Sequence, residues 1–215
     1  MDEKLIEARY DVTKKTKIKK FYETNKILIL CTISFFIILI VFIIFYSESK
    51  ESKKISLAEN YVTAKIYLSN KERNKAKDVL ENIVFANNST YSTLSLFLIL
   101  NENLITDQQE LSNLFDHVLK NNKFEKEIKN LLIFKKALFQ SNFVSEHELL
   151  DFTKPLLNTD TLWKPHTLLL LGDYFVFKKE YSKASEFYTQ ILTLKNLNEG
   201  LYEQARTQLR FITNE

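Results

Sequence analysis

The longest apolar stretch of the chain runs from residue 27 to residue 46 and reads ILILCTISFFIILIVFIIFY. None of its twenty residues is charged, and sixteen of them are Ile, Leu, Phe or Val. A helix of this length spans about 30 Å, the thickness of the hydrocarbon core of a bilayer. At about −0.3 to −0.6 kcal/mol for each apolar residue, insertion is favoured by roughly 5–10 kcal/mol. The pattern therefore predicts a transmembrane helix.

Two other interpretations of this stretch agree less well with the sequence. A buried helix of a soluble core would carry a polar stripe, and residues 27–46 have none. A cleaved signal peptide has a shorter apolar run that ends in small residues, whereas residues 46–50 read YSESK. We therefore expect an anchor that is not cleaved.

Residues 47–215 repeatedly show the 3.6-residue periodicity of amphipathic helices, for example from Asn74 to Phe85. Polar clusters interrupt the pattern at residues 69–71, 87–90, 120–123, 158–160 and 196–198. The whole chain contains two Gly and two Pro, which leaves few signals for strands and tight turns. The pattern predicts an all-α fold of roughly nine helices, joined by short loops into αα-hairpins.

One predicted hairpin matches the tetratricopeptide (TPR) consensus, a helix-turn-helix unit of about 34 residues. The matching residues after Pro165 are Leu168, Leu171, Gly172, Phe175, Tyr181, Ala184, Tyr188 and Ile191. We expect the small Gly172 and Ala184 to let the two helices approach closely, and the aromatic residues to fill the space between hairpins. Lys179 stands where the consensus usually has a glycine. A chance match within a helical protein is the alternative explanation.

The same spacing recurs in earlier units, which start near residues 57, 91 and 125. The first unit has Ala64, Tyr67, Ala76, Leu80 and Ile83, and the second has Tyr91, Leu94, Ser95, Leu98, Leu111, Phe115 and Val118. A degenerate unit covers residues 124–157, where we expect Pro155 to end or kink the second helix. The sequence thus predicts a TPR-like α-solenoid of about four hairpins with a C-terminal capping helix. Its packing residues are predicted to be Ala64, Tyr67, Ala76, Leu171, Gly172, Phe175, Ala184 and Tyr188.

These patterns divide the chain into four parts. We expect a basic tail over residues 1–26, the transmembrane helix over 27–46, a linker over 47–55 and the TPR-like domain over 56–215. Six Lys lie in residues 14–26 and three in residues 47–59. By the positive-inside rule the N-terminus is then cytoplasmic. The C-terminal domain of such a single-pass protein of the bacterial inner membrane would be periplasmic.

The distribution of charge also bears on the partners of the chain. Residues 47–215 contain 22 basic and 22 acidic residues, so the predicted domain is neutral and lacks the electrostatic footprint of a nucleic-acid-binding protein. The lysines next to Phe21 and Tyr22 suit anionic lipid headgroups. We expect the bilayer and other proteins as partners, and no nucleic acid.

The sequence offers no catalytic, cofactor or metal site. Phosphate-binding loops need several glycines close together. His117, His147 and His166 lack the spacing of metal ligands, and the acidic residues around His147 are typical of a solvated helix start. Cys31 lies in the apolar stretch, where a reactive thiolate is unfavourable. We therefore expect no enzyme activity, no cofactor and no small-molecule substrate.

The layout of the chain resembles one protein family. The tail segment Lys19-Lys20-Phe21-Tyr22 leads into a single span and then into a helix with Ala58, Tyr61 and Ala64. The segment Tyr91-x-x-Leu94-Ser95-x-x-Leu98 and a C-terminal repeat follow. This order is similar to the YfgM family of TPR-like ancillary subunits of the bacterial Sec translocon, although Ser95 stands where the family usually has Ala. The resemblance implies an inner-membrane protein that works with periplasmic chaperones on emerging secreted chains.

Repeat arrays of this kind bind partners along the concave wall formed by the first helix of each hairpin. The register predicts that the wall contains Tyr61, Lys65, Leu96, Ile99, Leu169, Asp173 and Phe177. Such a groove suits extended or helical peptides, unless some of these residues pack against the next hairpin. We therefore expect a membrane-anchored protein-binding module, an accessory factor linking the Sec translocon to periplasmic chaperones or client chains. The alternative is a TPR scaffold for envelope assembly or cell division.

Overall fold

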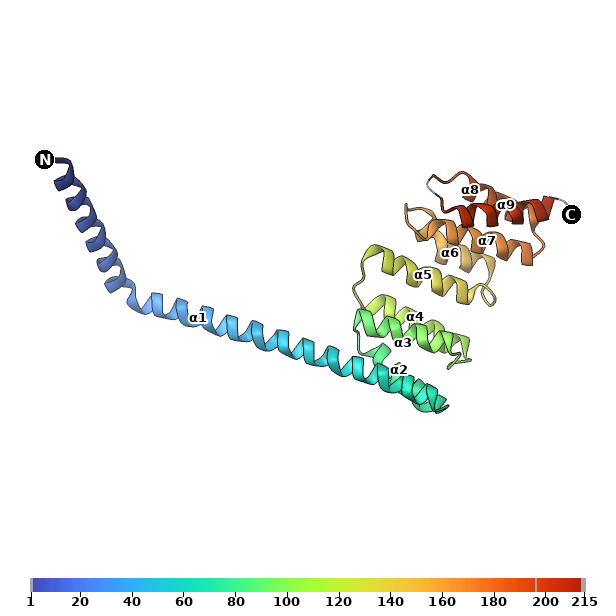
Figure 1. Cartoon of the computed structure of the whole chain (residues 1–215), viewed down its shortest axis with the longest axis horizontal. Coiled ribbons are helices and arrows are strands. Elements are labelled where there is room, and N and C mark those ends of the chain that lie inside the picture. The colour runs from blue at the N-terminus through green and yellow to red at the C-terminus, as the bar shows by residue number, and fades with distance from the viewer. Residues whose placement is uncertain (1, 196, 214–215) are drawn as a thin grey trace. The chain divides into compact units, whose positions relative to one another are not determined.

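The computed structural model describes the backbone of residues 2–195 and 197–213, and the side chains of residues 19–195 and 197–213. Within these ranges the chain forms nine helices and no strand, which confirms the all-α class (Figure 1). The helices are α1 (Asp2–Ser69), α2 (Arg73–Phe85), α3 (Ser89–Asn101), α4 (Gln108–Asn121), α5 (Lys126–Gln140), α6 (Glu146–Leu157), α7 (Lys164–Phe177), α8 (Tyr181–Leu192) and α9 (Glu199–Thr213).

Polar clusters in the sequence mark several of the observed helix ends. Helices α1, α2, α4 and α6 each end next to a predicted interruption, and α8 ends before the cluster that includes Asn196, which lies outside the described residues. Helix α6 continues through Pro155 and ends two residues later, at Leu157. The periodicity did not mark the loops at residues 102–107, 141–145 and 178–180.

The chain separates into two compact units between Ser56 and Leu57. In the first unit, α1 departs from helical geometry at Asn25, where φ is −111° and ψ is 15°. The side-chain amide of Asn25 donates a hydrogen bond to the carbonyl oxygen of Phe21, at 3.0 Å. Residues 47–55, which we expected as a linker, are helical.

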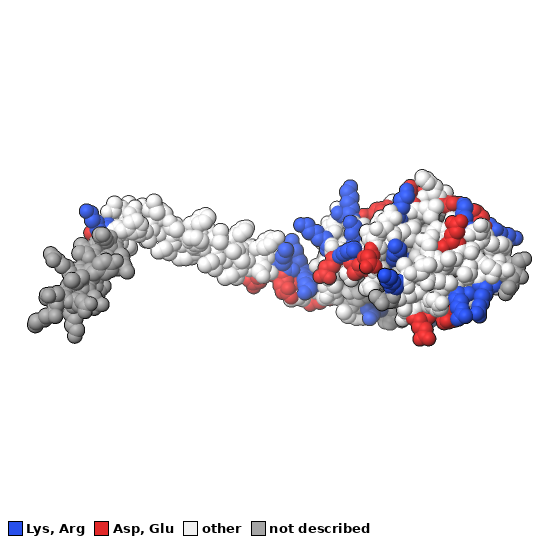
Figure 2. Space-filling model, turned by 90° about the horizontal axis from the view of Figure 1, so that it is seen from above, with Lys and Arg blue, Asp and Glu red and all other residues white. Residues whose placement is uncertain are grey.

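Helix α1 is the one helix of the described chain that is long and apolar enough to cross a membrane. Its most apolar window has a mean hydropathy of 3.4, and none of that window is buried within the protein. Figure 2 shows a stretch of α1 without charged side chains, whereas positive and negative charges are interspersed over the helical array. Nothing in the first unit therefore covers this apolar surface.

The second unit contains the end of α1 and helices α2–α9, which lie side by side in chain order (Figure 1). Each helix from α2 onward packs against the next one. Contacts between helices that are not consecutive join α2 to α4 and α7 to α9. The described part of this unit is thus a linear array in which a helix contacts its near neighbours in the sequence.

Three of the hairpin turns have the same backbone geometry. Lys71, Asn103 and Lys179 lie in the left-handed region, with φ of 64°, 46° and 61°. In the last of these turns, the N–H of Lys179 donates to the carbonyl of Val176 at 2.9 Å, and the N–H of Glu180 donates to that of Phe175 at 2.9 Å. The turns after α1 and α3 make the equivalent pair of bonds. This pair is the Schellman motif, and it caps the first helix of three hairpins in the same way.

The buried apolar residues of the second unit form two clusters that meet at α5. The first cluster includes Ala64, Leu80, Ile83, Leu96, Ile99, Phe115, Val118 and Leu132. The second includes Ala137, Leu149, Leu168, Leu171, Phe175, Ala184, Tyr188, Ile191 and Ala205. Helix α5 contributes Leu132 to one cluster and Ala137 to the other, so this helix links the two halves of the array.

Buried polar side chains of α5 make the contacts between these halves. Gln140 donates from Nε2 to Ser112 Oγ of α4 at 2.9 Å, and Lys136 Nζ pairs with Asp116 Oδ1 of α4 at 2.6 Å. On the other side, Asn130 Nδ2 donates to Thr161 Oγ1 at 2.9 Å. Buried polar groups need partners of this kind, because an unpaired group loses its hydration without compensation.

Gly172 of α7 lies against the ring of Tyr188 of α8. A Cβ atom added at Gly172 would overlap Cε1 of the Tyr188 ring, a contact that real Cβ atoms essentially never make. Of the residues that we expected to pack the repeats, Tyr67 is half-buried and the other seven are buried. Because Gly172 has no side chain, the Tyr188 ring can fill the space between α7 and α8.

We expect Gly172→Ala to lower the free energy of unfolding by about 1–3 kcal/mol, because the new methyl group displaces the Tyr188 ring. Chemical denaturation of the full chain in micelles measures this effect, with fluorescence of Trp163, the single tryptophan, as the signal. Gly200→Ala is the matched control, because its Cβ would meet only the side chain of Asn198, at 3.0 Å. Equal stability of the two variants would contradict the packing described here.

Lys179→Gly should raise the free energy of unfolding by about 0.5–1 kcal/mol. A left-handed backbone costs an L-residue roughly 1–2 kcal/mol, and the greater backbone entropy of glycine offsets part of the gain. Lys178→Gly is the control, since Lys178 has a right-handed backbone with φ of −78°. The same denaturation measurement should find Lys178→Gly destabilised, and stabilisation of both variants would argue against the left-handed turn.

Candidate functional site

The wall that we expected along the first helices is incorrect at α3. Leu96 and Ile99 are fully buried in the core, so they cannot line an open surface. Helix α3 packs against both α2 and α4, and it turns Ser92, Leu96 and Ile99 inward. Leu94 is 41% exposed instead.

Loop length explains this error of register. We aligned Leu94-Ser95 with Leu171-Gly172, which assumes equal loops in the two hairpins. The loop between α3 and α4 has six residues (102–107), whereas the loop between α7 and α8 has three (178–180). The second helix of the unit, α4, still buries Leu111, Phe115 and Val118. The longer loop thus shifts the register of α3 relative to α4.

On α7, the three expected wall residues differ in exposure. Leu169 is almost fully buried, whereas Phe177 is 77% exposed. Asp173 accepts a hydrogen bond from the hydroxyl of Tyr188 at 2.6 Å, so its carboxylate is tied to α8. Burial raises the pKa of Asp173, and the hydrogen bond from Tyr188 opposes this effect. Burial raises the pKa of Tyr188, and the hydrogen bond to the Asp173 carboxylate raises it further. The Tyr188 hydroxyl therefore stays protonated and donates the hydrogen bond.

The two expected wall residues of α1 also differ. The ring of Tyr61 is half-buried, with its centroid 6.4 Å from that of Tyr91 of α3, and burial raises the pKa of Tyr61. Lys65 is exposed. Of the seven residues expected to line the wall, Lys65 and Phe177 are thus the two that are exposed and are not held by a contact described above. The structure does not bring the seven together as one exposed wall.

Several exposed apolar side chains lie in loops or near helix ends, where sequence periodicity gives no signal. Within the described part of the second unit, the most exposed of them outside α1 are Phe85, Phe143, Leu162, Phe177 and Phe211. Phe143 and Leu162 lie in loops, and Phe177 is the last residue of α7. Exposed aromatic residues of this kind are candidates for contacts with other proteins.

A cavity of about 790 Å³ lies beside the N-terminal end of α7. Glu127 and Leu162, together with Lys164, His166, Lys195 and Leu201, form part of its lining. Its size is that of a ligand pocket. However, Oε2 of Glu127 accepts hydrogen bonds from Thr161 Oγ1 at 2.8 Å and from the N–H of Leu162 at 3.3 Å. This carboxylate therefore holds the loop between α6 and α7 in place.

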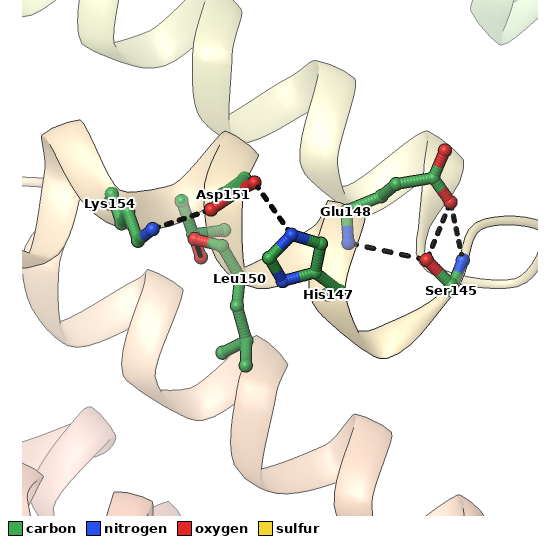
Figure 3. Close-up of polar contacts among 7 residues, drawn as sticks. Ser145, His147, Glu148, Leu150, Asp151 and Lys154 are labelled. Atoms are coloured by element: carbon green, nitrogen blue, oxygen red, sulfur yellow. Dashed lines mark hydrogen bonds and ion pairs between the residues drawn. The ribbon is translucent and has the colours of Figure 1, made fainter.

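The acidic residues around His147 form the start of α6. Ser145 and Glu148 make a capping box, in which Ser145 Oγ accepts from the N–H of Glu148 at 3.3 Å and Glu148 Oε2 accepts from the N–H of Ser145 at 2.9 Å (Figure 3). Hydrogen bonds from Ser145 lower the pKa of Glu148. Asp151 pairs with Lys154 at 2.6 Å and with His147 at 3.4 Å.

Glu148 therefore caps the helix, Asp151 pairs within the helix, and Glu146 Oε1 pairs with Lys183 Nζ of α8 at 2.7 Å. Among the side chains that the structure describes, no group of three or more His, Cys, Asp and Glu could hold a metal ion.

Comparisons with known proteins do not place the chain in a family. No protein-family model matches it, and no curated protein or solved structure does.

Alanine substitutions at Leu96 and Phe177 distinguish a buried core residue from an exposed surface residue. We expect Leu96→Ala to lower the free energy of unfolding by about 2–5 kcal/mol, since it leaves a cavity in the core. Phe177→Ala should change it by no more than about 0.5 kcal/mol, because the ring is exposed. Denaturation of the full chain in micelles, followed by Trp163 fluorescence, measures both. A core-like cost at Phe177 would show that this ring packs inside the domain.

Proposed function

We propose that this chain is a single-pass membrane protein whose helical repeat domain binds other proteins. The observation that carries the proposal is the pairing of an uncharged apolar segment of α1, which is not buried among the described residues of its own unit, with a packed array of amphipathic hairpins. A helix with apolar residues on all sides needs an apolar surrounding, and lipid supplies it. The array then remains in water as a domain tethered to the bilayer.

The repeat domain is a TPR-like α-solenoid in this proposal. Three Schellman turns at Lys71, Asn103 and Lys179 support it, because one local geometry recurs in the α1–α2, α3–α4 and α7–α8 hairpins. Contacts limited to near neighbours in the chain are also typical of repeat arrays. Helix α9 covers the last hairpin as a cap and buries Ala205 and Ile212 against it.

The orientation in the proposal places the N-terminus in the cytoplasm and the array on the opposite side. Close to the apolar helix, six Lys lie in residues 14–26 and three in residues 47–59, and such residues are retained on the cytoplasmic side. In a bacterium, the array would then lie in the periplasm.

The proposed role is that of an accessory factor at the Sec translocon, which holds periplasmic chaperones or client chains near the exit. The order of tail, span and repeats supports this role through its resemblance to the YfgM family. The exposed rings of Phe143 and Phe177 offer apolar contacts to a polypeptide. A scaffold for envelope assembly or cell division is the competing role.

Photo-crosslinking in intact cells distinguishes the two roles. We expect p-benzoylphenylalanine in place of Phe177 to crosslink to Sec subunits or periplasmic chaperones, since this ring is exposed. The same residue in place of Glu186, an exposed position on α8, is the matched control. Products identified by mass spectrometry as cell-division or envelope-assembly subunits would favour the scaffold. Identical products from the two positions would contradict a specific binding surface.

The orientation has its own test, since Cys31 in the apolar helix is the only natural cysteine. A cysteine at Ser182, an exposed residue of α8, should react with a membrane-impermeant maleimide in intact spheroplasts. A cysteine at Thr24, before the apolar helix, should react only after lysis. The reverse pattern would contradict the proposed topology.

A further inference from the structure

A cluster of positive charges lies directly before the apolar segment of α1. Residues 14–26 contain six Lys and a single acidic residue, Glu23. Among the residues whose side chains the structure describes, Lys19, Lys20 and Lys26 are exposed, and none of the three pairs with another described side chain. These ammonium groups are therefore available to anions outside the protein.

A bend in α1 separates most of these lysines from the apolar segment. Asn25, two residues before Ile27, departs from helical geometry and marks a kink in the helix. The Oγ1 atom of Thr24 donates to the carbonyl of Lys20 at 2.8 Å, and the Asn25 amide donates to the carbonyl of Phe21 at 3.0 Å. Side-chain hydrogen bonds to the preceding turn often bend helices, so the local sequence supports the kink.

The bend affects how far the lysines lie from the bilayer. At about 1.5 Å per residue, an unbroken helix would carry Lys14 about 20 Å beyond Ile27. The headgroup layer extends only about 5–8 Å beyond the hydrocarbon core, and salt screens charges over about 8 Å. A helix that bends at Asn25 can instead run along the headgroups, which keeps the lysines of residues 14–20 close to lipid phosphates.

Two exposed aromatic residues lie between the lysine run and the apolar segment. Phe21 is 65% exposed and Tyr22 is 51% exposed. Aromatic rings at the end of a span prefer the level of the headgroups, and lysine side chains near a span extend their charge toward the same layer. The rings and the lysines therefore favour the same surroundings.

We infer that residues 14–26 bind anionic phospholipids at the surface of the leaflet where the apolar segment enters the bilayer. In this arrangement Lys19, Lys20 and Lys26 pair with lipid phosphates, and the bend at Asn25 holds the preceding segment against the surface. Basic residues next to a span are attracted to anionic leaflets, which favours lipid over a soluble acidic partner. The inference rests on the proposed function, in which residues 27–46 span the bilayer.

The lipid selectivity of the full chain tests this inference. The chain is reconstituted in phosphatidylcholine vesicles that contain a trace of spin-labelled phosphatidylglycerol or spin-labelled phosphatidylcholine. Electron paramagnetic resonance separates lipid held at the protein from lipid of the free bilayer. At low salt, phosphatidylglycerol should associate at least about threefold more strongly than phosphatidylcholine. The preference should fall in about 1 M salt, where charges are screened over about 3 Å.

Two kinds of variant separate the effects of charge and bend. Lys19→Gln with Lys20→Gln should at least about halve the preference for phosphatidylglycerol. Lys53→Gln with Lys54→Gln is the matched control, since these two exposed lysines follow the apolar segment, and it should preserve the preference. Asn25→Ala keeps every lysine but favours an unbroken helix, so it should also lower the preference.

Three results would overturn the inference. Equal association of the two lipids would leave a soluble acidic partner for the lysines. Equal losses from the two pairs of lysine substitutions would place the effect outside residues 14–26, and an unchanged preference in Asn25→Ala would contradict the role of the bend. Failure of the proposed function would look different, because the spectra would then show no lipid of either kind held at the protein.

Discussion

The fold depends on the need of each helix beyond residue 57 to cover one apolar stripe. Helices α2–α9 are 12–15 residues long, and isolated helices of this length are marginal in water. Each helix is therefore stable only while its neighbours cover its stripe, which explains why they pack in chain order. The close contact between Gly172 and the Tyr188 ring shows how closely α7 and α8 pack to cover their apolar stripes. The apolar part of α1 has no such neighbour, and we propose that lipid covers it.

The organisation of the array has consequences for binding. Two apolar clusters form the cores of the two halves of the array, and Asn130, Lys136 and Gln140 of α5 make polar contacts with neighbouring segments. A cavity lies beside Gln140, and exposed aromatic rings lie in loops and near helix ends. In the proposed function, binding therefore uses loops and helix ends as well as the first helices of the hairpins.

Much of this fold could be predicted from the sequence, because helix ends follow polar clusters and core positions follow the 3.6-residue period. The register of α3 could not, since it depends on the length of a loop (residues 102–107) that no periodicity marks. Lys71 and Asn103 were not expected to be left-handed, because the usual glycine signal is missing there. The cavity at Gln140 was also not predictable. It arises where the start of α4 meets the end of α5, and local sequence does not encode that contact.

Hydrogen exchange of the full chain in lipid nanodiscs, followed by mass spectrometry, tests the central claim that both neighbouring helices and lipid cover apolar surface. Slow exchange is predicted for residues 27–46 and for α7 and α8, whereas the loops at residues 102–107 and 178–180 should exchange within seconds. Rapid exchange throughout α7 and α8 would contradict a packed array. Rapid exchange in residues 27–46 would contradict the membrane anchor.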